Sequence, residues 1–91
     1  MECWLDESLE ISTVLNAKDK YLEWLKQGSS ISIDASQVVR VDTAGLQTLA
    51  SLFVSAKHAG LDINLVNSSS VLTDAITLLN LENQFYSEKE L

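Results

Sequence analysis

The sequence predicts a single small α/β domain, in which a mixed, mostly parallel sheet packs against about three helices. Its 91 residues suit one domain, and 46% of them are apolar, which is enough for one hydrophobic core. Short segments with the periodicity of strands alternate with longer segments with the periodicity of helices. Strands separated by helices are typical of parallel crossover connections, so the helices are expected to pack on the sheet.

The first half of the chain contains two short apolar pieces followed by a helix. Residues 3–5 and 9–11 are mainly apolar and are separated by polar residues, so a minor pair of strands, or a strand and a loop, is expected. Ser12 is the expected cap of the helix, and Gly28 is its expected end. The apolar residues of this helix fall on one side at helical spacing: Val14, Tyr21, Leu22 and Leu25.

The second half of the chain contains two clear strand patterns around a long helix. Residues 30–34 and 62–66 alternate apolar with polar residues, which predicts a strand in each segment. Residues 38–41 are a shorter apolar piece, and a helix is expected from about 43 to 59, with Gly60 as its end. One face of this central helix is apolar: Leu46, Leu49, Ala50, Phe53 and Ala56.

A last helix and a tail complete the chain. Ser70 is the expected cap of the last helix. Residues 86–91 are expected to be a mobile tail of one domain that spans residues 1–91. The aromatic residues near the ends could form an apolar patch, but packing in the core is the preferred interpretation: Trp4, Trp24, Phe85 and Tyr86.

The chain is strongly acidic. It has 6 Lys and Arg residues against 13 Asp and Glu residues, for a formal net charge of −7. This excess repels phosphate backbones and anionic lipids, so nucleic acids and membrane surfaces are poor partners. Cys3 is the only cysteine, which excludes an internal disulfide and favours a reducing compartment.

No segment indicates export or membrane insertion. Residues 1–17 contain no Lys or Arg, whereas a secretory signal begins with a basic region. The longest uncharged run, 43–56, is shorter than the ~18 apolar residues that mark a membrane span. The expectation is a small, soluble, cytoplasmic protein without direct membrane insertion.

The entry into the central helix has an unusual composition. Asp42 can cap this helix by accepting hydrogen bonds from amides of its first turn. Thr43, Ala44 and Gly45 then follow, although a cap does not require three small residues in succession. Small side chains allow another backbone to approach the helix end closely, and Gly45 also allows tight packing against the sheet.

The outer face of the central helix is polar but uncharged. No charged side chain occurs between Asp42 and Lys57. An exposed helix usually carries Lys and Glu, whereas the cores of protein interfaces are depleted in charge. The composition therefore indicates either a protein docking surface or a helix that is covered by the domain's own tail. The outer face consists of Gln47, Thr48, Ser51, Ser55 and His58.

Catalytic and metal sites have little support. Asp34 and Asp42 form a candidate acidic pair similar to that of a phosphorelay receiver, but no lysine follows a later strand at a convincing position. His58 has no second His or Cys nearby and is expected to be a surface residue, so no metal site is assigned. No nucleotide-binding motif occurs, and no nucleophile and base stand together. A non-enzyme without a cofactor is expected, and a small ligand-binding or enzymatic domain is the weaker alternative.

The stretch "SISIDASQVVRVDTAGLQTLASLFVSAKHAGLDINLVNSSSVLTDAITLLNL" resembles the STAS domains of bacterial anti-sigma factor antagonists and related proteins. The shared pattern is a strand that ends in Asp, then "VDTAGLQ", a long helix that ends at Gly, a strand and a last helix. The sequence is most similar to the shorter branch of this family. That branch includes the STAS subunit of phospholipid-asymmetry transporters and STAS proteins of chemotaxis-like clusters.

The resemblance implies a signalling domain that acts by binding a protein partner and not by catalysis. In the antagonists, a partner kinase phosphorylates a serine just before the Gly, and the modified form loses its partner. Ala44 stands at that position, so the usual switch cannot operate there. Thr43 matches the preceding Ser/Thr of the motif and is the candidate phosphoacceptor. The partner-binding residues expected here are Asp42, Thr43, Ala44, Gly45, Gln47, Thr48 and Ser51.

The partner implied by the resemblance is an anti-sigma or kinase-like ATPase, which makes the chain a partner-switching regulator that docks through Asp42 to Leu46. The alternative is a cytoplasmic subunit that regulates the ATPase of a phospholipid transporter. Homodimerisation is left open. A phosphate on Thr43 carries roughly −1.5 to −2 charge. Burying it unpaired against a partner costs more than the about 0.3–1 kcal/mol gained at the helix N-terminus, so phosphorylation is expected to release the partner.

Overall fold

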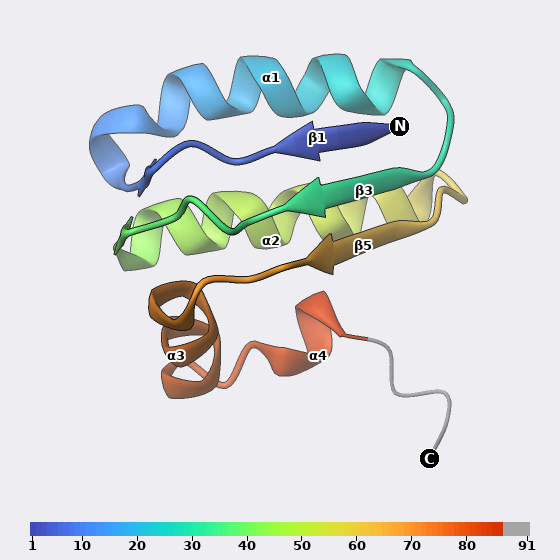
Figure 1. Cartoon of the computed structure of the whole chain (residues 1–91). Helices are drawn as coiled ribbons and strands as arrows, with labels where there is room; N and C mark the ends of the chain where they lie inside the picture. Colours follow the sequence, from blue (N-terminus) through green and yellow to red (C-terminus); the bar gives the residue numbers. More distant parts are fainter. Residues whose placement is uncertain (87–91) are drawn as a thin grey trace.

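The computed structural model describes residues 1–86 and has a three-stranded parallel sheet at its centre (Figure 1). In spatial order its strands are β1 (Glu2–Trp4), β3 (Ile31–Asp34) and β5 (Ile63–Val66). Two shorter strands form a second parallel pair, β2 (Ser8–Leu9) and β4 (Arg40–Val41). Every pairing among these strands is parallel, which confirms the predicted α/β fold with a mostly parallel sheet.

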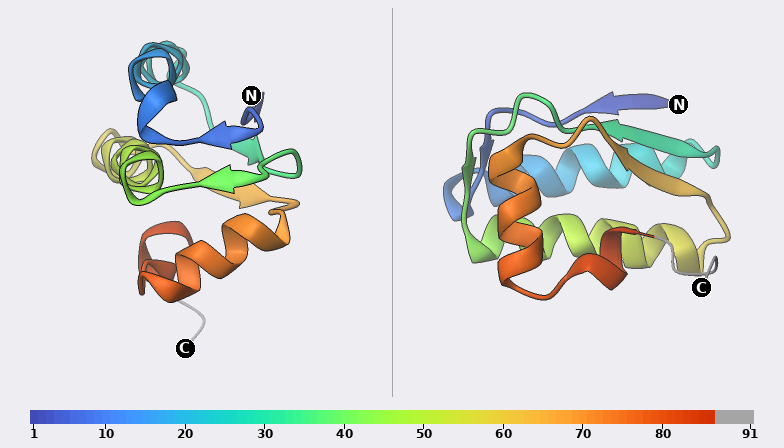
Figure 2. Two further views of the ribbon diagram at one scale, coloured as in Figure 1. Left: turned by 90° about the vertical axis from the view of Figure 1, so that its left-hand side faces the viewer. Right: turned by 60° about the horizontal axis from the view of Figure 1, so that its bottom comes forward.

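The two longest helices lie side by side on one face of the sheet. They are α1 (Val14–Lys26), which follows the 3₁₀ turn η1 (Ile11–Thr13), and α2 (Thr43–His58). Both helices run in the same direction, as Figure 2 shows end-on in its left view. The shorter helices α3 (Ser70–Leu78) and α4 (Glu82–Phe85) lie beyond β5 (Figure 1).

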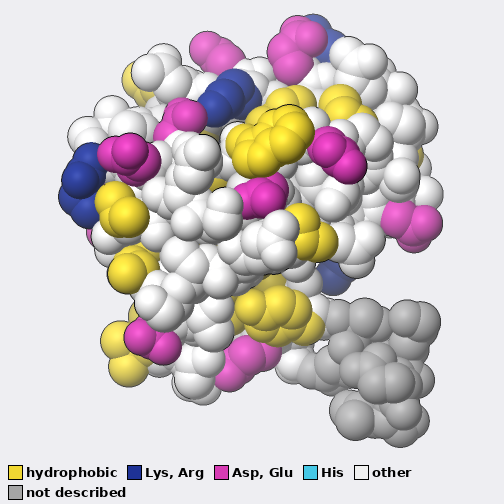
Figure 3. Space-filling view, in the orientation of Figure 1, with side chains coloured by type: hydrophobic (Ala, Val, Ile, Leu, Met, Phe, Trp, Pro, Cys, Tyr) yellow, Lys and Arg dark blue, Asp and Glu magenta, His cyan; other side chains and the backbone are white. Residues whose placement is uncertain are grey.

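Strand β3 shows why the sheet has one buried and one open face. Ile31 and Ile33 are fully buried, whereas Ser32 and Asp34 alternate with them and are half-buried. The open face is turned toward the viewer in Figure 3, where acidic and hydrophobic side chains are interspersed without a continuous basic patch. Trp4 is 53% exposed, so its predicted place in the core is wrong.

The central helix α2 forms as its sequence predicts. The residues of its predicted apolar face are buried, except Ala50, which is half-buried. The helix begins after Asp42 and ends before Gly60, whose φ of +78° is a left-handed conformation that glycine adopts without strain. The buried residues of α2 are Gly45, Leu46, Leu49, Leu52, Phe53 and Ala56.

Two predicted helix caps are displaced. Ser12 does not cap α1, because it lies inside η1, which the Thr13 hydroxyl stabilises by donating to the Glu10 carbonyl over 2.9 Å. Helix α1 therefore begins one residue later than expected, at Val14. For α3 the cap is Ser69, whose Oγ accepts from the Leu72 N–H over 3.2 Å, and not the expected residue one position later.

The segment after α3 packs against the core. Phe85 is 4% exposed, and its ring lies 4.9 Å from that of Phe53 in an edge-to-face arrangement. Trp24 is half-buried and its ring centroid lies 5.2 Å from that of Tyr21, so Phe85 and Trp24 do pack as predicted. Tyr86 is exposed. The mobility expected for the tail concerns residues 87–91, which lie outside the described residues.

Candidate partner-binding site

Asp42 holds the start of α2 in place through both of its carboxylate oxygens. Its Oδ1 accepts from the Gly45 N–H over 2.8 Å, and its Oδ2 accepts from the Ile11 N–H over 3.0 Å. The Asp42 N–H in turn donates to the Leu9 carbonyl over 3.0 Å. The first-turn bond from Gly45, followed by that from Ile11, lowers the pKa of Asp42 below its ordinary value. The predicted cap is therefore present, and it also ties α2 to the segment between β2 and α1.

Gly45 is buried because the chain's own backbone crosses it. A Cβ at this position would overlap the carbonyl of Leu9 and lie 2.6 Å from the Glu10 nitrogen. The close backbone approach expected at the helix start is therefore made by β2 and the residue after it. Gly45 supports the site from below and does not itself present a surface to a partner.

The remaining candidate residues of α2 face outward. Thr43, Gln47 and Ser51 are exposed, and Ala44 and Thr48 are half-buried. The Thr48 hydroxyl donates to the Ala44 carbonyl over 2.9 Å, so its polar group is engaged within the helix. Helix α4 packs against α2 through the contact of Phe85 with Phe53, and within residues 1–86 it does not cover Thr43, Gln47 or Ser51.

A groove with a volume of ≈ 490 Å³ runs between α1 and α2 beside these residues. Its α1 wall is mainly apolar, whereas its α2 wall consists mostly of small or uncharged polar side chains. Among the described residues, Lys18 is the only charged one that lines it. The groove is lined by Ile11, Val14, Lys18, Tyr21, Leu22 and Leu25 of the first wall, and by Ala44, Gln47, Thr48, Ser51, Leu52 and Ser55 of α2.

Asp34 is occupied elsewhere and does not extend the site. Its Oδ1 accepts from the N–H and the hydroxyl of Ser36 over 2.9 and 2.6 Å, and its Oδ2 accepts from Asn67 over 3.0 Å. These bonds, with the Ser36 hydroxyl first, lower the pKa of Asp34. Asp34 thus fixes the turn after β3 and the turn after β5, while Asp42 fixes the helix start, and each carboxylate has a structural role.

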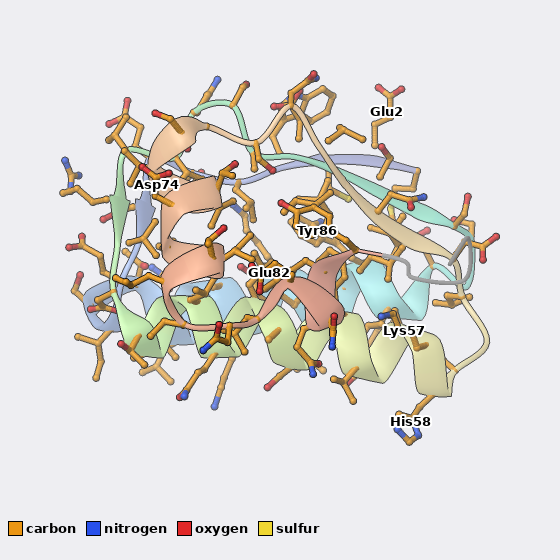
Figure 4. The ribbon with its side chains drawn as sticks, turned by 90° about the horizontal axis from the view of Figure 1, so that it is seen from below. Glu2, Lys57, His58, Asp74, Glu82 and Tyr86 are labelled. Carbon is orange, nitrogen blue, oxygen red and sulfur yellow. The ribbon has the colours of Figure 1, made fainter. Side chains whose placement is uncertain are left out.

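Other chemistry-bearing groups are dispersed. Figure 4 shows His58 pointing away from the body of the domain at the end of α2. Within residues 1–86 no three His, Cys, Asp or Glu residues gather as a metal site. Burial raises the pKa of the Cys3 thiol, which disfavours its reactive thiolate form. No helix in the described part of the chain has the length and apolar character needed to cross a bilayer.

The family described as "Mlab, STAS domain" matches residues 4–87. The chain therefore belongs to the STAS domain family. STAS domains act as interaction and regulatory modules that bind other proteins, and are generally non-catalytic. The sequence of this STAS domain gives no match among curated proteins.

The α1 side of the groove was missed when the site was predicted from sequence. The predicted site of this STAS domain lay on α2 alone, and Leu22 was assigned to the apolar side of the first helix. Ile11 is 70% exposed and Leu22 is 57% exposed, and both line the groove. Leu22 stood at helical spacing, where an apolar residue is usually a core residue, and Ile11 was assigned to the short apolar piece 9–11 before the helix.

Proposed function

We propose that this STAS domain docks a partner protein through the N-terminal end of α2 and the adjoining groove, and that charge on Thr43 controls the docking. The observation that carries the proposal is the exposure of Thr43 and Gln47 at a helix start that the chain's own contacts already hold in place. The surface exists without the partner, so little ordering is needed on binding. The proposed partner contacts are Thr43, Ala44, Gln47, Thr48 and Ser51, supported from below by Asp42 and Gly45.

The control by charge follows from the position of Thr43. As the first residue of α2, it stands next to Asp42, whose oxygens are already engaged. Transfer of a phosphoryl group from ATP to the Thr43 hydroxyl, with release of ADP, would add a second anion beside groove-lining residues of α2 that include no cation. That anion is tolerated in water but opposes coverage by a partner. Partner switching by a kinase-like ATPase is therefore the leading function.

A second candidate function is a cytoplasmic STAS subunit that regulates the ATPase of a phospholipid transporter. Two observations favour it. The matched family is described as "Mlab, STAS domain", and Ala44 has no hydroxyl at the position of the usual phosphoserine. The same surface would then form a constant contact with the ATPase.

The deciding experiment measures binding to a candidate partner, which is an ATPase or a kinase-like protein. Thr43→Glu is expected to weaken binding by at least about tenfold, because a buried unpaired carboxylate opposes association. The unfolding free energy of Thr43→Glu should equal that of wild type or exceed it by about 0.3–1 kcal/mol, because an acid in the first turn interacts favourably with the helix dipole.

The matched control is Thr73→Glu, an exposed threonine near the start of α3. It is expected to leave binding unchanged. Equal binding by Thr43→Glu and wild type would reject the proposed surface. Incubation with ATP separates the two functions: a phosphoryl group on Thr43 supports partner switching, whereas a change in the partner's ATPase rate without labelling supports the transporter subunit.

A further inference from the structure

The α1 wall of the groove follows the spacing of a helix-packing seam. Position 11 in η1 and positions 14, 18, 22 and 25 in α1 recur every three or four residues, and all but the middle one are apolar. Ile11 and Leu22 remain largely exposed, so the seam is not completed within residues 1–86. A seam with this period matches another helix that lies along α1.

The α2 wall allows such a helix to come close. Ala44, Thr48, Ser51 and Ser55 are small, are spaced by four, three and four residues, and all line the groove. The distance between packed helices depends on the side chains at their contact, and small ones permit a close approach. Because α1 and α2 run side by side in the same direction (Figure 2), one helix can lie along both of them.

Lys18 specifies the chemistry of the occupant. It lies at the middle of the seam, it is the only charged residue of the groove, and it forms no salt bridge within residues 1–86. Covering an unpaired ammonium group is unfavourable unless the covering surface supplies an anion. An occupant of this groove therefore needs one carboxylate opposite Lys18 and apolar side chains on either side of it.

The position of Lys18 also disfavours a second copy of the chain. In a two-fold antiparallel packing of this seam, Ile11 would face Leu25 and Val14 would face Leu22. Lys18 would then face its own copy, because 18 is the midpoint of 11 and 25. Like charges at the centre of a contact oppose it, so the seam is directed toward a different protein.

We infer that the groove between α1 and α2 receives one amphipathic α-helix of the partner protein, whose central carboxylate pairs with Lys18. This inference rests on the proposed docking function and names the element that the partner uses. The groove is continuous with the Thr43 surface, because Ile11 and Ala44 line its end and Asp42 joins Ile11 to the first turn of α2. One end of the bound helix would therefore lie beside Thr43.

The test uses the full chain and synthetic helical peptides of about five turns, with leucine at the seam positions. Three peptides differ only in the central residue, which is Glu, Gln or Lys. The Glu peptide is expected to bind about tenfold more tightly than the Lys peptide, with backbone NMR shifts concentrated along the groove. Lys18→Glu should reverse this order, and Leu22→Arg should abolish binding of all three.

Three outcomes would overturn the inference. They are equal affinity for the three peptides, shifts that map to the open face of the sheet, and a wild-type dimer that Leu22→Arg dissociates. The proposed docking function is tested separately, by measuring binding of the same variants to the candidate partner protein. If Thr43→Glu loses binding while Lys18→Glu and Leu22→Arg retain it, the docking surface is supported and the partner helix in the groove is rejected. If all three variants still bind, both the docking surface and the partner helix are rejected.

Discussion

Helix α2 has a neighbour on each side, and the two neighbours pack against it differently. On the α4 side, Phe53 and Phe85 meet edge to face, and both rings are buried. On the α1 side, small residues such as Ala44 and Ser51 stand opposite Ile11 and Leu22, and a groove of ≈ 490 Å³ remains. Residue size along α2 therefore distinguishes a side that packs into the core from a side that leaves a groove.

Phe85→Ala gives the largest expected effect and tests the closed side. Loss of the buried ring should lower the unfolding free energy by about 3–5 kcal/mol in chemical denaturation. Leu22→Ala, on the open side, should change it by only about 0.5 kcal/mol, because its side chain is already largely in water. Equal losses in the two variants would contradict the distinction between the two sides.

Gly45→Ala tests the base of the open side. Its new methyl group would overlap the Leu9 carbonyl, so the variant should lose about 1–3 kcal/mol of stability although alanine favours helices. Gln47→Ala is the control, and its exposed position should keep the change within about 0.5 kcal/mol. A Gly45→Ala protein as stable as wild type would show that β2 can move away from α2.

Ser51→Trp tests whether a bulky side chain can fill the groove between α1 and α2. The exposed serine leaves room for a ring in the groove, so stability should change by about 0.5 kcal/mol at most. Binding of the Glu peptide, measured by calorimetry, should fall by about tenfold because the ring occupies its place. Undiminished binding would place the docking site outside the groove.

Asp42→Asn gives the smallest expected effect, and its signature is a dependence on pH. Since the folded state lowers the pKa of Asp42, its carboxylate contributes stability above the ordinary pKa, and this contribution is lost as pH falls through the lower folded value. The stability gap between wild type and Asp42→Asn should therefore be constant near neutral pH and shrink below about pH 4. A gap that does not change down to pH 3 would mean that the bonds to Gly45 and Ile11 do not favour the charged form.

Much of the fold was predictable because it depends on local patterns. The alternation in β3 and the apolar face of α2 each identify an element within a few residues. The cap by Asp42 was equally local. The bond from Ile11 to Asp42 was not, because the two residues are 31 positions apart and no pattern in either segment indicates the other.

The candidate site was predictable on α2 and not on α1. Uncharged residues such as Gln47 and Ser51 are unusual on an exposed helix, and this anomaly marked one wall of the groove. Leu22 was expected on the apolar side of the first helix and Ile11 in a short apolar piece before it, so neither was expected to be exposed. Tight packing of Gly45 against the sheet was expected, but no local pattern indicated that Leu9 and Glu10 would be the residues that cross it.

The crossing of Leu9 and Glu10 over Gly45 has a practical consequence for any experiment on this domain. The first ten residues contribute no side chain to the groove lining, yet they clamp the helix start on which the surface is built. A cut or fusion that loosens them would impair recognition from a distance. Affinity tags and fluorophores are therefore better attached elsewhere, for instance at the exposed residues of α3.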